Sequence, residues 1–182
     1  MSRQDIKTII FLTFLLLAIP GCGDDDDHND LTPNVAGVWN LSANLTSNSC
    51  PVPATPIVVD QFSITQNGNA LTAVDTSGAP YTGSITGNTI RLSLATPTTE
   101  TEDSCTLTGD IDVLAFVNPG EVNPSRATGT LSFLFTSSGS CALPINCRVD
   151  HSLTMERAGV AKEQPSGYPG LRKVLGEMMN RF

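Results

Sequence analysis

The chain has 182 residues, with 18 acidic and 10 basic side chains and a formal net charge of −8. This length suits one domain with appendages. Residues 31–157 carry ten acidic residues against four Arg and no Lys, and an acidic body without a basic face is a poor match to a phosphate backbone. These features exclude nucleic acid as a partner.

The first 21 residues have the parts of an export signal. Arg3 and Lys7 give a positively charged start, and residues 9–19 (IIFLTFLLLAI) follow as an apolar stretch. A stretch of this length is typical of a signal peptide and is shorter than the about 20 apolar residues of a membrane-spanning helix. We predict that residues 1–21 are a cleaved signal peptide.

The end of this segment resembles the lipobox of bacterial lipoproteins, in which Leu or Ile, a small residue and Gly or Ala precede a Cys. Ile19, Gly21 and Cys22 match that pattern, and Pro20 departs from it. The resemblance implies cleavage before Cys22 and acylation of this residue, with palmitate among the acyl groups, which anchors a protein to a membrane. Gly23 implies sorting to the outer membrane. An ordinary signal peptide with an incidental Cys is the alternative.

Residues 22–35 are expected to form an acidic tether after the acylated Cys. Four consecutive Asp occupy residues 24–27, and His28 follows them. Such a segment cannot bury enough apolar area to fold. Calcium binding is the alternative, but the run lacks the Gly turn and the distal Glu of an EF-hand loop. We interpret it as a solvated spacer.

From residue 36 onward, apolar and polar side chains alternate with period two, which predicts half-buried β-strands. The strands are expected at residues 38–46, 57–66, 70–75, 81–86, 89–95, 105–117, 127–135 and 148–157. Asn67-Gly68 and Gly87-Asn88 supply tight hairpin turns. Residues 96–103 (TPTTETED) are expected to be a polar loop.

About eight sequential strands joined mostly by short turns predict an all-β antiparallel meander over residues 36–157. Eight strands close into a small barrel whose interior is filled by side chains or holds one small ligand. A β-sandwich is the alternative. The first strand opens with Gly37-Val38-Trp39, which resembles the Gly-x-Trp of lipocalin-like barrels. That resemblance implies that Trp39 plugs the closed end of the barrel.

The C-terminal segment, residues 158–182, has a different pattern. Residues 158–170 have the composition of a linker, and apolar residues then recur at helical spacing from Leu171 to Phe182. A helix this short needs a surface against which to bury its apolar stripe. We expect an amphipathic helix packed on the barrel or a disordered tail, and the alternative is docking on a membrane or a partner.

Four cysteines remain once Cys22 is assigned to the anchor. An even number in an exported domain predicts two disulfides with three possible pairings. We favour Cys141–Cys147, across a short loop, with Cys50–Cys105 as the second bond. The spacings lack a CxxC pair, so no metal site is expected.

The sequence does not predict an enzyme or a cofactor. His28 and His151 are the only histidines, and no nucleophile elbow or phosphate-binding Gly loop is present. His151 alternates with apolar residues that face inward, and Asp60 shares a face with Val58 and Phe62. We name Trp39, Asp60 and His151 as candidate residues of a ligand cavity, with Asp60 as the hypothetical partner of His151.

These observations lead to two hypotheses of function. The first is a non-catalytic binding module for a small apolar ligand or an envelope protein, lipid-anchored in the bacterial envelope at the outer membrane. The second is a structural or assembly lipoprotein that docks through its C-terminal helix. An enzyme is the least supported class.

Overall fold

The computed structural model describes residues 32–159 and 169–182, so the predicted signal peptide, Cys22 and most of the tether lie outside the described residues. Residues 31–182 form one compact unit with its own core. Its elements are β1 (Gly37–Asn48), β2 (Ile57–Asn67), β3 (Ala70–Val74), β4 (Pro80–Thr86), β5 (Thr89–Leu94), β6 (Thr98–Glu102), β7 (Cys105–Val117), β8 (Arg126–Gly139), β9 (Asn146–Arg157) and α2 (Leu171–Met179).

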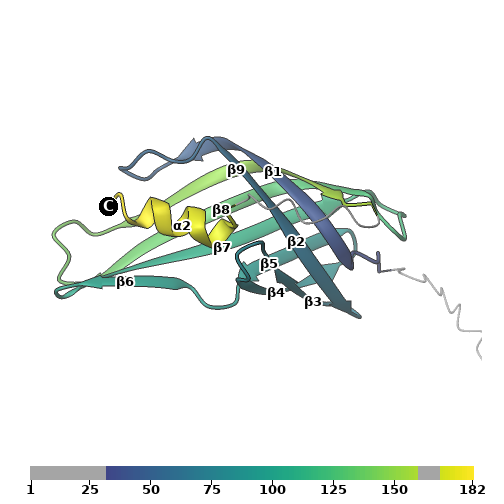
Figure 1. Ribbon diagram of the computed structural model, residues 1–182, viewed down its shortest axis with the longest axis horizontal. Coiled ribbons are helices and arrows are strands. Elements are labelled where there is room, and N and C mark those ends of the chain that lie inside the picture. The colour runs from purple at the N-terminus through teal and green to yellow at the C-terminus, as the bar shows by residue number, and fades with distance from the viewer. Residues whose placement is uncertain (1–31, 160–168) are drawn as a thin grey trace, which may run out of the picture. The chain divides into compact units, whose positions relative to one another are not determined.

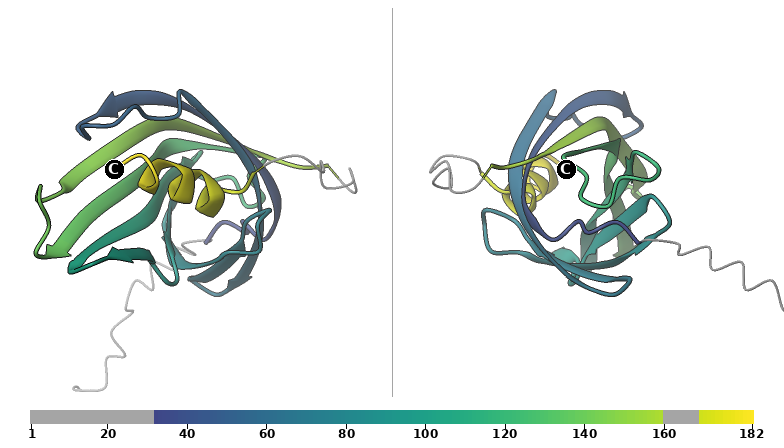
Figure 2. Two further views of the ribbon diagram at one scale, coloured as in Figure 1. Left: turned by 60° about the vertical axis from the view of Figure 1, so that its left-hand side comes forward. Right: turned by 90° about the vertical axis from the view of Figure 1, so that its right-hand side faces the viewer.

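Eight of these strands form a closed antiparallel barrel, which confirms the predicted fold class. The sheet order is β5-β4-β3-β2-β1-β9-β8-β7-β6, and an additional pairing of β5 with β7 closes the ring. Neighbouring strands surround a common interior in the end-on view of Figure 2. β6 is the extra strand, and α2 lies against the barrel as the single helix of the described ranges (Figure 1).

The ring closes over only half of its length, because β7 is longer than β5. Residues 112–116 of β7 pair with β5, whereas residues 105–109 pair with β6. On the other side of the interruption, β3 pairs only with residues 63–67 of β2. Residues 57–62 of β2 therefore have β1 as their only strand partner within the described ranges. We call this interruption of the ladder between β2 and β6 the side gap.

Two regions of the barrel follow from this pairing. The closed half contains the β5–β7 pairing and the β2–β3 hairpin, and the splayed half contains β6 and the side gap. The prediction of a polar loop at residues 96–103 was wrong, because β6 occupies most of it. Its sequence, TTETE, is mostly exposed and has no apolar alternation. β6 forms through a two-residue turn and the ladder with β7, which period-two patterning does not reveal.

The predicted alternation places the core inside the barrel. Phe133 and Phe135 of β8 are buried, as are Leu153 and Met155 of β9. Ser132 and Leu134 of β8 and Thr154 of β9 alternate with them on the outer face, where Ser132 is also buried. The strand periodicity therefore identified the core face correctly.

The folded domain begins before residue 36. Val35 is fully buried, and its amide donates to Gln66 Oε1 at the end of β2. The amide of Asn34 donates to the Val122 carbonyl in the β7–β8 loop. Residues 33–36, which we call the strap, therefore connect the β2–β3 side of this barrel end to the β7–β8 side.

Two disulfides form, but the pairing predicted from the sequence was wrong. Cys50 is bonded to Cys147, and Cys105 is bonded to Cys141. The short loop between Cys141 and Cys147 joins β8 to β9, and each of these cysteines faces a different neighbouring strand.

The strand register explains the observed pairing. Asn48 of β1 opposes Val149 of β9, so the positions two residues further along, Cys50 and Cys147, come opposite each other. Gly139 of β8 opposes Cys105 of β7, so Cys141 lies just beyond the same register position. Both disulfides are therefore in the splayed half.

Candidate functional site

Trp39 lies under the strap, at the end of the closed half. Its side chain is fully buried, and its indole Nε1 donates to the Val35 carbonyl at 2.8 Å. The Arg157 guanidinium lies over the ring, 4.9 Å from its centroid. This geometry is a cation–π contact.

Arg157 also fixes the surrounding backbone. It donates to the carbonyls of Pro124, Ala36 and Asn34 at 3.0, 2.8 and 2.6 Å. Burial lowers the pKa of this guanidinium below its usual value. The last residue of β9 therefore joins the strap to the β7–β8 loop, and this end of the barrel is held shut.

The splayed half is closed by α2. The helix contacts β7, β2 and β6, the strands that surround the side gap, and it lies between β2 and β6 in Figure 1. Its buried residues follow i, i+3, i+4 spacing: Leu171, Val174, Leu175, Met178 and Met179. The predicted amphipathic helix thus exists and packs on the barrel.

Gly109 lies where α2 packs closely against the inner face of β7. It faces inward from β7, and a Cβ at this position would lie 2.8 Å from Met179 Sδ and 2.9 Å from Leu175 Cδ1. A side chain at this position would require the ends of the Met179 and Leu175 side chains to shift. A Gly within an alternating strand is a known sign that another element approaches closely.

The N-terminus of α2 is held by two carboxylates of the barrel. Asp60 Oδ2 accepts a hydrogen bond from the Leu171 amide at 2.7 Å, and Asp75 Oδ2 accepts one from the Arg172 amide at 3.3 Å. Asp60 is 1% exposed and Asp75 is 5% exposed. Negative charge at this end of a helix is stabilising because it complements both the free amides and the helix dipole.

Gly170 explains why the helix needs partners from the barrel. This residue is the N-cap, with φ 73°, and it has no side chain with which to cap the helix. A Cβ on it would lie 2.6 Å from Ser77 Cβ. The close approach of the helix start to the β3–β4 turn therefore favours Gly there, and Asp60 and Asp75 provide the capping.

The remaining contacts of the two carboxylates come from neighbouring turns. Asp60 Oδ1 accepts from the Thr76 hydroxyl at 2.6 Å and from the Gln61 amide at 2.7 Å. Asp75 Oδ1 accepts from the hydroxyl and the amide of Ser77, and the Tyr81 hydroxyl lies 3.3 Å from Oδ2. The pair thus forms one connected network below the helix start.

Burial shifts the protonation equilibria of this network. It raises the pKa of Asp60 above its usual 3.8, and the nearby charge of Asp75 acts in the same direction, against the hydrogen bonds that Asp60 accepts. Burial and the charges of both aspartates also raise the pKa of the Tyr81 phenol. Tyr81 therefore remains a donor to Asp75 at neutral pH.

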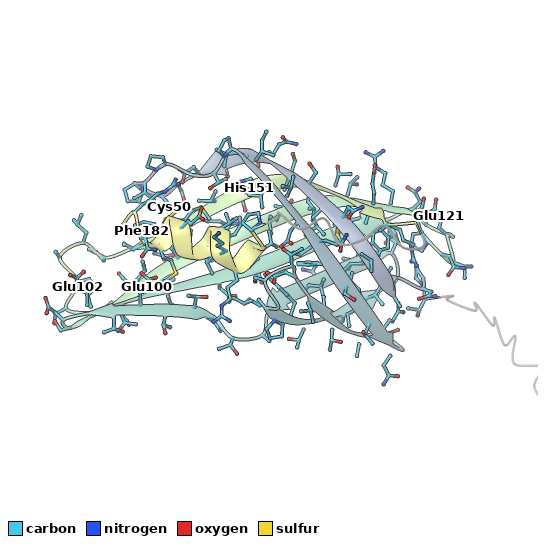
Figure 3. The ribbon with its side chains drawn as sticks, viewed as in Figure 1. Cys50, Glu100, Glu102, Glu121, His151 and Phe182 are labelled. Atoms are coloured by element: carbon cyan, nitrogen blue, oxygen red, sulfur yellow. A yellow bond between two sulfur atoms is a disulfide. The ribbon has the colours of Figure 1, made fainter. Side chains whose placement is uncertain are left out.

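His151 is fully buried on β9, as its alternation indicated. Its Nε2 lies 2.8 Å from the Thr55 carbonyl, which can only accept, so Nε2 carries the hydrogen. Phe133 packs edge-on against the ring at 5.6 Å between centroids. Nδ1 has no hydrogen-bond partner among the described residues. The position of the side chain is shown in Figure 3.

The predicted pairing of Asp60 with His151 does not form. Both side chains are buried, but the partners of Asp60 are those named above, and His151 bonds to Thr55. Trp39 belongs to the opposite end of the barrel, beneath the strap. The three candidate residues therefore do not share one hydrogen-bond network, and of the three it is Asp60 that accepts a hydrogen bond from α2.

Sequence reasoning missed Asp75, Gly109 and Arg157. Gly109 had a signal, since it occupies an inward position between Leu107 and Ile111, where an apolar residue was expected. Asp75 and Arg157 each read as the polar end of a predicted strand. Their roles depend on long-range contacts that local patterning does not contain.

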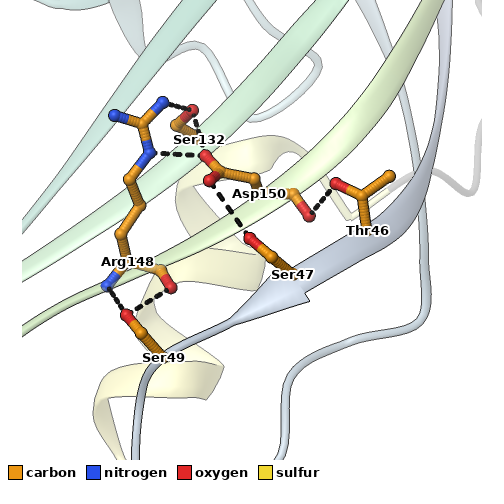
Figure 4. Close-up of polar contacts among 6 residues, drawn as sticks. All are labelled: Thr46, Ser47, Ser49, Ser132, Arg148 and Asp150. Atoms are coloured by element: carbon orange, nitrogen blue, oxygen red, sulfur yellow. Dashed lines mark hydrogen bonds and ion pairs between the residues drawn. The ribbon is translucent and has the colours of Figure 1, made fainter.

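A polar network on the outer face is a second cluster, shown in Figure 4. Arg148 forms an ion pair with Asp150, and Asp150 also accepts from the hydroxyls of Ser132 and Ser47. Burial acts to raise the pKa of Asp150, but these hydrogen bonds and the Arg148 charge outweigh it and lower the pKa. The network joins β8, β9 and β1 beside the register shift in β1. We assign it a structural role.

The described residues contain no group of three or more His, Cys, Asp or Glu side chains arranged to hold a metal ion. Within the same ranges, no helix has the length and hydropathy required to span a bilayer. Comparison of the chain with protein-family models, with curated proteins and with solved structures finds no match.

Proposed function

We propose that this chain is a bacterial envelope lipoprotein, held at the outer membrane by acyl groups on Cys22, whose barrel is a non-catalytic binding module. The ligand is a small apolar molecule or a protein partner. One observation carries the binding role: the side gap, which the chain itself fills with a separate apolar element. Binding sites commonly combine apolar walls with a few polar groups that fix orientation.

The polar groups beside the gap support this role. Asp60 and Asp75 lie at the start of α2, where they hold two backbone amides. Thr98 Oγ1 of β6 is buried without a hydrogen-bond partner among the described residues, and Thr98 opposes Gly109, which α2 contacts. An occupant of the gap can therefore donate hydrogen bonds to the Asp60 and Asp75 carboxylates at one end, and it lies beside the Thr98 hydroxyl along one side.

The second candidate function, assembly through the C-terminal helix, requires the apolar stripe of α2 to be available. All five residues of that stripe are buried against the barrel. This role would require release of the helix, so the side gap is better supported as the binding element than the helix.

A catalytic role has little support from the arrangement. His151 is the single histidine within the described ranges, and its hydrogen bond goes to a backbone carbonyl. Nucleophilic catalysis requires a base within hydrogen-bond reach of a Ser or Cys. The four described cysteines are all in disulfides.

The anchor is tested by mass spectrometry of the protein extracted from its host. We expect an N-terminus at Cys22 with the added mass of acyl chains, and loss of that mass and of membrane association in Cys22→Ser. An unmodified Cys22, or an intact N-terminus at Met1, would contradict the lipoprotein proposal.

The binding role is tested by native mass spectrometry of residues 31–182 released from the host envelope. This segment contains the whole compact unit, its core and both disulfides. A bound molecule or protein that is lost on denaturation would support the proposal. A mass equal to the oxidised chain alone, in material from the native envelope, would contradict it.

A further inference from the structure

We propose that the side gap is an exchangeable helix-binding site, and that α2 of a second copy of this chain can occupy it in place of the chain's own α2. This inference rests on the proposed binding function and names its ligand class. The ligand is a basic amphipathic helix that lacks an N-cap side chain.

The apolar complementarity is already present in the structure. The buried positions of α2 are spaced at i, i+3, i+4, i+7 and i+8, which is the pattern of helices that bind in grooves. At the far end, Phe182 packs against Phe135 of β8, with 5.2 Å between ring centroids (Figure 3). The Arg181 guanidinium donates to the Pro53 carbonyl. The contacts with the barrel therefore continue beyond the end of α2 to the last residues of the chain.

The barrel also recognises the start of a helix. Asp60 and Asp75 accept hydrogen bonds from backbone amides of Leu171 and Arg172 and from no side chain of α2. The recognition therefore does not depend on which chain supplies the helix. A helix with a capping side chain at the Gly170 position would clash with Ser77, because a Cβ there would lie within 2.9 Å of three Ser77 atoms.

Charge favours a basic occupant. The exposed face of α2 carries Arg172 and Lys173 against one acidic residue, Glu177, and the exposed Arg181 follows the helix. Residues 31–157 carry ten acidic residues and four Arg, and Glu100 and Glu102 are exposed on β6 at the edge of the gap (Figure 3). A second copy of α2 satisfies the apolar, capping and charge requirements together.

The length of the connection between the barrel and the helix sets the competition between a chain's own helix and that of another copy. α2 is joined to β9 through residues 158–170. A helix tethered through a linker of this length competes for its own site at an effective concentration on the order of millimolar. Exchange between copies, which is a form of domain swapping, is therefore expected when copies reach comparable local density, as anchoring to one membrane would promote.

The site is tested with a fluorescent peptide of residues 169–182 and the chain 31–182 carrying Leu175→Asp and Met178→Asp. These substitutions release the chain's own helix and leave the barrel walls unchanged. We expect the released chain to bind the peptide, measured by fluorescence anisotropy, about tenfold or more tightly than the unaltered chain, whose site is filled.

Two matched controls address the gap itself. Adding Gly109→Val to the released chain places a side chain where Met179 and Leu175 lie, and we expect it to weaken peptide binding about tenfold or more. Thr108→Val, the outward-facing neighbour, is expected to leave binding unchanged. A released chain that retains its circular dichroism and both disulfides but does not bind the peptide would refute the proposal.

A second measurement keeps the proposal testable if the released barrel unfolds. A photo-crosslinking phenylalanine at position 182 of the unaltered chain 31–182 lies against Phe135. We expect crosslinks within one copy at about 10 µM and a growing fraction between copies toward about 1 mM, the range of the effective concentration. Crosslinks confined to single copies throughout would refute helix exchange. If the chain showed no helix exchange but still retained a small molecule from its host, the proposed binding function would remain supported.

Discussion

The two halves of the barrel are closed by different means. In the closed half, β5 pairs with β7 to complete the ladder, and Trp39, Arg157 and the strap cover the end. In the splayed half the ladder is interrupted, and α2 and two disulfides hold it together. Continuous backbone pairing cannot be exchanged without unfolding the strand, whereas a docked helix can leave with the sheet intact.

This difference indicates where the molecule can respond to a partner. The strap end joins three elements through the guanidinium of Arg157 and places the only Trp in the core. In the splayed half, α2 is held by burial of its apolar stripe and by two hydrogen bonds from its backbone amides to carboxylates. We therefore expect perturbations of the two ends to have separable effects.

The largest expected effect is the loss of the Cys50–Cys147 disulfide, which closes a separation of 97 residues. In the chain-entropy model, the Cys50→Ser, Cys147→Ser pair costs about 4–5 kcal/mol of unfolding free energy, measured in urea. The Cys105→Ser, Cys141→Ser pair is expected to cost about 1 kcal/mol less, because its separation is 36 residues. A larger cost for the shorter connection would contradict this ranking.

Arg157→Met is expected to cost about 3 kcal/mol. The substitution retains an apolar stem but removes the contact with Trp39 and the hydrogen bonds to three carbonyls. Hydrogen exchange is expected to accelerate at the Asn34 and Val35 amides and to remain unchanged in α2. Equal acceleration at both ends would show that the two halves are coupled.

Gly109→Val is expected to cost about 2 kcal/mol, because the new side chain overlaps Met179 and Leu175. Val suits a β-strand, so the cost falls on the contact with α2. Exchange of the α2 amides is expected to approach that of a free peptide, while the β5–β7 ladder stays protected. Thr108→Val is the control, and a similar loss there would assign the effect to the strand instead.

The smallest effect concerns the pH dependence that Asp60 contributes. Because burial raises its pKa in the folded state, Asp60 contributes stability that is fully present below the unfolded pKa of about 4 and is lost as the pH rises through the folded pKa. The stability difference between the wild type and Asp60→Asn should therefore shrink as the pH rises through that window. It is measured by urea unfolding at several pH values, and a difference that grows with pH would contradict the sign.

Much of the barrel is predictable from local patterning. Alternation located eight strands, and Gly87-Asn88 located the β4–β5 turn, because strand periodicity and turn chemistry are properties of neighbouring residues. The β2–β3 turn is Gly68-Asn69, one residue later than the predicted Asn67-Gly68. β6 was not predicted, because its polar sequence has no alternation between a buried and an exposed face. The disulfide pairing depends on strand register, which places Cys50 opposite Cys147 across a long separation.

The site was less predictable than the fold. Asp60 and His151 were correctly expected to face inward, but their partners, Leu171 and Thr55, come from distant segments. The capping of a helix by carboxylates more than 90 residues away in the sequence has no local signature. Gly109 has a sequence context that indicates a close approach, but Gly83 and Gly129 share this context and approach the backbone of neighbouring strands instead.

The central claim, that α2 is a docked and separable occupant of the side gap, is tested most directly by native-state hydrogen exchange on residues 31–182. We predict that the amides of α2 are protected relative to a free peptide of residues 169–182 and open with a smaller free energy than the β7–β8 ladder. Opening of α2 together with that ladder in one global transition would contradict the account, because the helix would then be a permanent wall of the barrel.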